Sequence, residues 1–142
     1  MIGNVSGMKT THHIFLALAF FTTMVANGQF LQIKGKIINY EEEFIPAHFA
    51  LFRNDSLVQS GRSDALSFKL DLNQNYRLQV YRTGYQTKAI DFTTSTPVDK
   101  KFKFEFSVVL QKLPGYRESE DVKASGHVFY DDKKERFNYR IY

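Results

Sequence analysis

Residues 68–92 read FKLDLNQNYRLQVYRTGYQTKAIDF and hold the pattern that decides the fold. Apolar and polar side chains alternate in residues 68–72 and again in 76–80, with an Asn-rich turn between the two runs. A break at Gly84 precedes a third run, 85–92. Alternation with a period of two, bounded by turn residues, is typical of half-buried antiparallel strands. The stretch therefore predicts a β-sheet of short strands joined by tight turns.

The same alternation continues on both sides of this stretch. We expect strands at residues 31–38, 47–53, 57–60, 65–72, 76–82, 85–92, 102–110, 126–130 and 137–142. The predicted fold class is all-β, an antiparallel sandwich of about seven short strands followed by a hairpin. Phe104 and Phe106 share one face of the strand at 102–110, so we predict both as core residues. Gly35, in the middle of the first strand, predicts a bulge or a close backbone contact.

The first 28 residues have the features of a secretory signal peptide. A weakly basic start precedes the apolar run 14–21, and Ala26-Asn27-Gly28 fits the small-x-small rule for cleavage. A retained membrane anchor is the alternative, but the apolar run is short for a bilayer, which takes about 20 residues. We therefore expect residues 1–28 to be removed and the exported chain to begin at Gln29.

Changes in composition divide the rest of the chain into three parts. We predict a β-sandwich over residues 29–111, a linker over 112–125 and a C-terminal hairpin or tail over 126–142. An isolated hairpin is marginally stable in water, so this last part must dock either on the sandwich or on a partner. Its aromatic content favours a role in docking over a role in folding of the sandwich. Whether it docks on its own sandwich or on a partner remains open.

Composition narrows the class of protein. The chain of 142 residues has no cysteine, so it offers no disulfide, no thiolate metal site and no thiol nucleophile. A cysteine-free exported chain fits a bacterial envelope better than a small animal secreted domain. No basic-aromatic motif accompanies the formal net charge of +4, which argues against binding of nucleic acid. We expect a periplasmic or outer-membrane-associated protein of a Gram-negative bacterium, with no transmembrane span after signal cleavage.

Several short motifs occur in an order that points to a family. They are Gly35-Lys36-Ile37, Ile45-Pro46-Ala47-His48-Phe49, Phe68-Lys69-Leu70, Tyr76-Arg77-Leu78-Gln79-Val80 and Gly84-Tyr85. This order resembles the carboxypeptidase regulatory-like domain over roughly residues 31–92. The resemblance implies a seven-stranded, transthyretin-like or Ig-like sandwich with a tight turn at Gly84 and no catalytic residues. Two turns depart from the family: Asp64-Ala65-Leu66-Ser67 lacks the usual glycine, and Asn75 stands where a glycine is usual.

Few residues show a pattern that catalysis or metal binding needs. After the signal peptide the histidines are His48 and His127, which with residues 131–132 would make a weak metal site. Two surface histidines are the simpler interpretation. No Gly-x-Ser-x-Gly motif marks a nucleophile, and the carboxylates at 41–43 stand in a charged turn where solvation explains them. We expect no enzyme, no cofactor and no metal.

Aromatic side chains supply the remaining functional signal. The chain has 14 Phe and 8 Tyr, more than one small core is expected to hold. We predict a candidate interaction surface from Phe52, Tyr81, Tyr116, Phe129, Tyr139 and Tyr142. The predicted function is a non-catalytic exported module that binds or braces another envelope or outer-membrane protein. The alternatives are a carbohydrate- or small-ligand-binding accessory module that uses exposed Tyr and Phe, or a hairpin that simply covers Phe52 and Tyr81.

Overall fold

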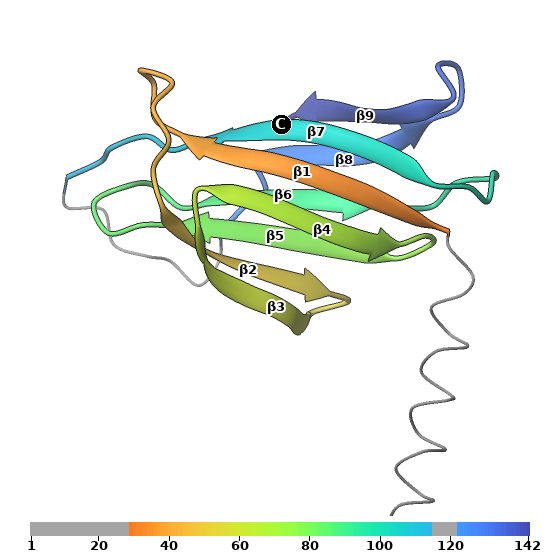
Figure 1. Cartoon of the computed structure of the whole chain (residues 1–142), viewed down its shortest axis with the longest axis horizontal. Helices are drawn as coiled ribbons and strands as arrows, with labels where there is room; N and C mark the ends of the chain where they lie inside the picture. The colour runs from red at the N-terminus through yellow and green to blue at the C-terminus, as the bar shows by residue number, and fades with distance from the viewer. Residues whose placement is uncertain (1–28, 115–121) are drawn as a thin grey trace, which may run out of the picture.

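The computed structural model describes residues 29–114 and 122–142, so the predicted signal peptide and Tyr116 lie outside the described residues. The described chain forms nine strands (Figure 1). They are β1 (Phe30–Ile38), β2 (Ala47–Arg53), β3 (Ser56–Ser63), β4 (Ala65–Asp71), β5 (Asn75–Tyr81), β6 (Lys88–Thr93), β7 (Phe102–Val109), β8 (Gly126–Asp131) and β9 (Arg136–Ile141).

The strands form two sheets that lie one over the other (Figure 1). The small sheet has three strands in the order β4-β1-β7, and the large sheet has six in the order β3-β2-β5-β6-β8-β9. The predicted all-β class is therefore confirmed, but the pairing is mixed rather than antiparallel. β1 runs parallel to β7, and β6 runs parallel to β8. Parallel neighbours need a long connection, and here each connection contains at least one other strand.

The core lies between the two sheets and comes from the inward phase of each strand. Leu31 and Ile33 of β1 are fully buried, as are Leu78 of β5 and Phe92 of β6. The inward phase of β2 is also buried, through Ala47, Phe49 and Leu51. Each large apolar side chain buried in this way contributes about 1.5–3 kcal/mol to the free energy of unfolding.

Phe104 and Phe106 of β7 pack against this core as predicted, but they are only half-buried. Phe102 and Val108, in the same phase at the two ends of β7, are buried. Phe106 pairs with Gly35, and a Cβ at Gly35 would stand 2.7 Å from Cζ of the Phe106 ring. The close contact predicted at Gly35 is therefore made by an aromatic side chain rather than by backbone.

Two strands differ from the predicted extent by three residues at one end, whereas the other bounds agree to within one residue. β3 continues to Ser63 instead of ending at residue 60, and only Asp64 separates it from β4. β6 begins at Lys88, whereas the alternation predicted a start at Tyr85. Both differences lengthen or shorten an element without changing which side chains face inward.

The turns around β5 explain the late start of β6. Gly84 has a left-handed φ of 81°, which fits the tight turn expected there. Tyr85 then pairs with Lys112 in an isolated bridge. Before β5 the left-handed residue is Asn73, with φ of 60°, and Asn75 already belongs to the strand.

The C-terminal hairpin is part of the large sheet. β8 pairs with β6, and β9 forms the outer edge. Val128 is fully buried, and Phe137 packs edge-to-face against Phe102 of β7 with ring centroids 5.1 Å apart. The hairpin covers its apolar side with its own domain, which is one of the two alternatives that the sequence leaves open. That the sandwich folds without the hairpin stays a prediction. The hairpin also extends the sheet that carries Phe52 and Tyr81 instead of lying over them.

Candidate functional site

The outer face of the large sheet, the side turned away from the small sheet, carries a continuous row of side chains. Strand register places Phe52 of β2 opposite Arg77 of β5, and Arg77 opposite Asp91 of β6. Asp91 lies opposite His127 of β8, which in turn pairs with Arg140 of β9. Each of these residues has a buried neighbour along its own strand or its partner strand, so their side chains point outward. We call these five residues the outer row.

An ion pair stands in the middle of the outer row. Arg77 Nε donates to Asp91 Oδ1 at 2.7 Å, and a second guanidinium nitrogen donates to Oδ2 at 3.1 Å. This two-point geometry holds both planar groups in one orientation. The third guanidinium nitrogen donates to the carbonyl oxygen of Val122 at 3.3 Å, in the segment that leads to β8. The hydrogen bond to Asp91 raises the pKa of Arg77, so the guanidinium remains charged.

His127 is fixed by neighbours on three sides. Its Nε2 lies 2.8 Å from the hydroxyl oxygen of Thr93 on β6. The ring of Tyr142 is nearly parallel to the imidazole, at 12° and 6.3 Å between centroids, and Phe129 is 5.7 Å away. The guanidinium of Arg140 covers the other aromatic ring, 4.9 Å from the centroid of Phe129. This end of the outer face is therefore an ordered aromatic cluster.

A groove of about 630 Å³ lies along the outer row and includes its ion pair. Phe52 lines it on the β2 side of the Arg77–Asp91 pair, and His127 with Tyr142 lines it on the β8 side. The β2–β3 turn forms one end, where Asn54 and Asp55 have left-handed φ angles of 48° and 67°. Two successive left-handed residues are typical of a tight hairpin turn, which brings polar side chains to the groove.

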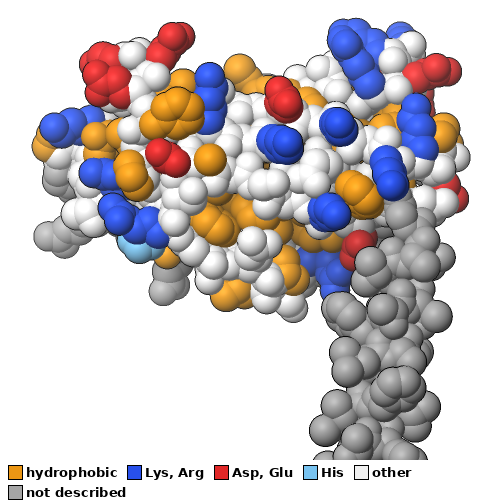
Figure 2. Space-filling view, in the orientation of Figure 1, with side chains coloured by type: hydrophobic (Ala, Val, Ile, Leu, Met, Phe, Trp, Pro, Cys, Tyr) orange, Lys and Arg blue, Asp and Glu red, His pale blue; other side chains and the backbone are white. Residues whose placement is uncertain are grey.

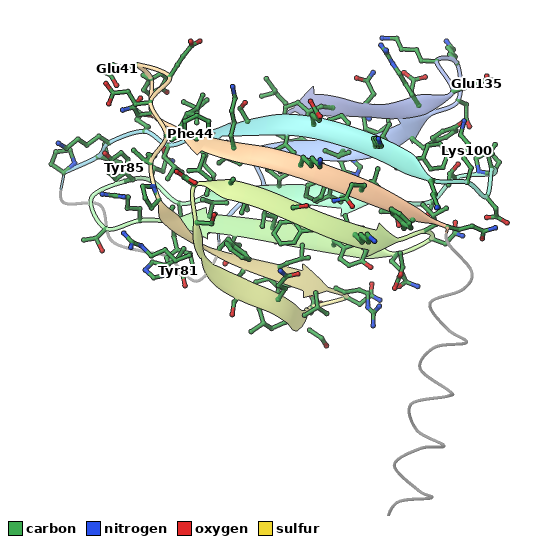
Figure 3. All side chains as sticks on the ribbon, viewed as in Figure 1. Glu41, Phe44, Tyr81, Tyr85, Lys100 and Glu135 are labelled. Atoms are coloured by element: carbon green, nitrogen blue, oxygen red, sulfur yellow. The ribbon has the colours of Figure 1, made fainter. Side chains whose placement is uncertain are left out.

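The six predicted surface residues do not form one patch. Phe52, Tyr81, Phe129 and Tyr142 are on the outer face of the large sheet, whereas Tyr116 lies outside the described residues. Tyr81 stacks on His48, with ring centroids 5.3 Å apart. Figure 3 places Tyr81 at the opposite end of the large sheet from Glu135, which marks the β8–β9 turn. The groove therefore gathers Phe52 and Tyr142, and Tyr81 stands apart from it.

Tyr139 belongs to the other side of the large sheet. It pairs with the buried Val128, and its ring covers Gly126, where a Cβ would collide with the tyrosine hydroxyl. Burial raises the pKa of Tyr139. The side chain is partly exposed only because β9 is an edge strand, so its role is packing against the hairpin's own glycine.

Sequence reasoning missed the polar half of the groove. Arg77, Asp91 and Thr93 lie in the outward phase of their strands, which the alternation in the sequence does reveal. Their assembly depends on which strands are neighbours and in which register, and no feature of a single sequence specifies either.

The described residues contain no group of three or more His, Cys, Asp or Glu side chains that could hold a metal ion. His48 and His127 lie on β2 and β8, with β5 and β6 between them. Within the same described ranges, no helix has the length and apolar character needed to cross a membrane.

The free edge of the large sheet at β3 is a second notable surface, seen along the lower rim of Figure 1. Seven of its eight residues are exposed, including Leu57 at 57% and Val58 at 47%. Val58 has no partner on β2, because the register shifts there and leaves a bulge. Arg62 is the only charged residue in β3, and the strand has neither Lys nor Pro. Edge strands usually carry such residues to block pairing with other chains.

Neither a family model nor a curated protein matches this chain. The resemblance to the carboxypeptidase regulatory-like domain therefore stays a prediction.

Proposed function

We propose that the chain is a non-catalytic, exported β-sandwich module that binds another cell-envelope protein through the β3 edge. The observation that carries this proposal is the exposure of β3 along almost its whole length. The unpaired backbone N–H and C=O groups of an edge strand can bond an extended segment of a partner, which joins the sheet as one more strand. Leu57 and Val58 add exposed apolar surface at one end of this edge.

Other edges of the sandwich are less suited to strand addition. β4 carries Lys69 and Asp71, and β7 carries Lys103 and Glu105. β9 is two residues shorter than β3 and carries Arg136 and Arg140. Charged side chains on an edge strand oppose pairing with another chain. Among the described edge strands, β3 is the one with a single charge.

The remaining parts of this proposal rest on the sequence. We propose cleavage after Gly28 and a periplasmic or outer-membrane-associated location in a Gram-negative bacterium. We also propose that residues 29–111 are a carboxypeptidase regulatory-like domain of transthyretin-like topology. The division of β1 to β7 between three strands of the small sheet and four of the large sheet supports this assignment. The hairpin of β8 and β9 is then an addition to the large sheet.

Site-specific photo-cross-linking tests the β3 edge. A photoreactive residue replaces Ser60 of β3, and the control carries it at Ser67 of β4, which is also an exposed serine on an edge strand, in the small sheet. Both proteins are exported in a Gram-negative host, and adducts are identified by mass spectrometry. We expect a discrete protein adduct from Ser60 and none from Ser67.

A charge on the edge supplies the second arm of this test. Val58→Lys should abolish the Ser60 adduct and leave the melting temperature unchanged, because Val58 is already solvated. Identical adducts from Ser60 and Ser67, or an adduct that survives Val58→Lys, would show that β3 is not the binding edge.

A further inference from the structure

We propose that the groove on the outer face binds a neutral saccharide, held by the Arg77–Asp91 pair and stacked against Phe52 and Tyr142. This site adjoins the β3 edge at the β2–β3 turn, where Phe52 pairs with Leu57, but it does not depend on the function proposed for that edge. The inference follows from three properties of the groove: its fixed polar groups, its aromatic sides and its balance of charge.

The polar groups of the groove suit adjacent hydroxyl groups. The side chains of Arg77 and Asp91 are 41% and 31% exposed, so both present unused donor and acceptor positions to solvent. Guanidinium donates and carboxylate accepts, and a sugar hydroxyl can do both at once. Because the two groups already hold each other in place, a ligand would not have to order them on binding. Asn75 and Thr93 add further polar atoms to the lining.

Aromatic rings stand on both sides of this polar centre. Phe52 lies on the β2 side, and Tyr142 lies on the β8 side above His127. The face of a sugar ring that carries axial C–H bonds is apolar and packs well on an aromatic ring, while its hydroxyls point to the rim. Tyr142 is 68% exposed, so its ring is accessible to a ligand. The groove's volume of about 630 Å³ falls among those of small-molecule sites.

Charge in the groove argues for a neutral ligand. Arg77 is matched by Asp91, and Asp55 contributes a second carboxylate at the turn end. An anionic ligand would meet an arginine that is already paired and a carboxylate that repels it. A protein partner would need a larger apolar centre than two separated rings.

Titration with defined sugars tests the proposal. Amide NMR spectra of the purified protein are recorded with cellotriose, maltotriose, mannotriose and tri-N-acetylchitotriose, and with trigalacturonate as an anionic probe. We expect at least one neutral sugar to bind with Kd of about 1 mM or tighter. Its shifts should centre on the amides of Phe52, Arg77, Asp91 and His127.

Matched variants separate a specific site from general surface binding. Asp91→Asn should weaken binding about tenfold, by removing a charged acceptor. Its control, Glu105→Gln, removes one carboxylate from the outer side of the small sheet. Tyr142→Ala should weaken binding roughly three- to tenfold through lost stacking. Its control is Tyr40→Ala, because Tyr40 is also 68% exposed.

Three results would overturn this inference. They are no binding of any neutral sugar, tighter binding of trigalacturonate than of every neutral sugar, or equal losses in the variants and their controls. A protein cross-linked from a photoreactive residue at Tyr142, combined with no sugar binding, would assign the groove to a protein instead. Melting temperatures of all four variants show whether each one is folded. If Asp91→Asn does not fold, Tyr142→Ala still tests the site.

Discussion

The outer faces of the two sheets follow the same alternation but carry different side chains. The small sheet presents four lysines and two carboxylates among polar residues, and its one outward ring, Phe30, lies under the ammonium of Lys69; the charged residues are Lys34, Lys36, Lys69, Lys103, Asp71 and Glu105. Figure 2 shows this face, with basic side chains spread over the sheet rather than gathered at one point. The large sheet instead presents aromatic rings around a paired arginine and aspartate.

This difference separates a face that only needs solvation from one that has a further use. Lysine keeps its charged end in water while its stem covers the strand beneath, so the small sheet's outer face is complete without a partner. Aromatic rings in outward phase gain nothing from water, and their grouping on the large sheet is why we propose a ligand for that face. Matched substitutions in the two sheets test whether the sheets also differ in how their side chains contribute to stability.

The largest expected effect concerns the outer strand of the large sheet. Phe137→Ala removes a nearly buried ring that packs edge-to-face on Phe102 and on Tyr130. We expect a loss of about 3–5 kcal/mol in the free energy of unfolding, as for other buried aromatics. Denaturant unfolding followed by circular dichroism gives the value.

Phe104→Ala on the small sheet is the natural comparison. Its ring is only half-buried at an edge, so the loss should be clearly smaller than that for Phe137→Ala. Equal losses in the free energy of unfolding for the two variants would contradict this prediction. They would mean that Phe137 of the hairpin contributes no more to stability than the half-buried Phe104.

A smaller difference is expected between two glycines that lie under aromatic rings. Gly35→Ala would place its Cβ 2.7 Å from the Phe106 ring, which is held by Phe92 at 5.9 Å between centroids. We expect a loss of about 1–3 kcal/mol from this overpacking. Gly126→Ala meets the hydroxyl end of Tyr139, a side chain at an edge that can swing outward. Thermal melts should therefore rank Gly35→Ala as the more damaging change, and the reverse order would show that Tyr139 is fixed.

The smallest expected effect is a pH dependence at the β8–β9 turn. The Asp131 carboxylate accepts hydrogen bonds from the backbone N–H groups of Lys134 and Lys133 and from Asn138, which together lower its pKa. Because this pKa is lowered, the Asp131 carboxylate stabilises the turn at any pH above the pKa of Asp in the unfolded chain, about 3.9. This contribution is lost as the pH falls through the lower folded value.

Amide exchange at Lys133 and Lys134 should measure the change at this turn. Exchange at these amides, corrected for its intrinsic pH dependence, should become less protected as the pH drops below about 4. Asp131→Asn should remove this dependence, and amides on the small sheet should not respond. A dependence that persists in Asp131→Asn would assign it to another group.

The strands were predictable because alternation records inward and outward phase directly. Every predicted strand from 31–38 to 137–142 corresponds to an observed one, and the inward phase of β2 is correct residue by residue. Alternation does not say which strands are neighbours. The parallel pairings of β1 with β7 and of β6 with β8 were therefore not predicted.

The same limit explains what was predicted of the candidate site. The surplus of aromatic side chains predicts Phe52 and Tyr142 as surface residues, and both line the groove. Arg77 and Asp91 became recognisable only once β5 and β6 were known to pair in one register. Tyr139 was assigned to the surface because it is aromatic, although it shares the inward phase of Phe137.

The place of β1 in the small sheet has a consequence for how the chain folds. β1 is the central strand of that sheet, and its partners are β4 and β7. Ile33 therefore pairs with Phe68 and Phe104, which are distant from it in the sequence. The large sheet contains three hairpins of consecutive strands, β2–β3, β5–β6 and β8–β9, which can close locally. A nascent chain can form the β2–β3 and β5–β6 hairpins early, but β1 has to wait for the synthesis of β7. High contact order of this kind makes folding slow, on the order of milliseconds to seconds, and leaves the apolar side of β1 uncovered until the end.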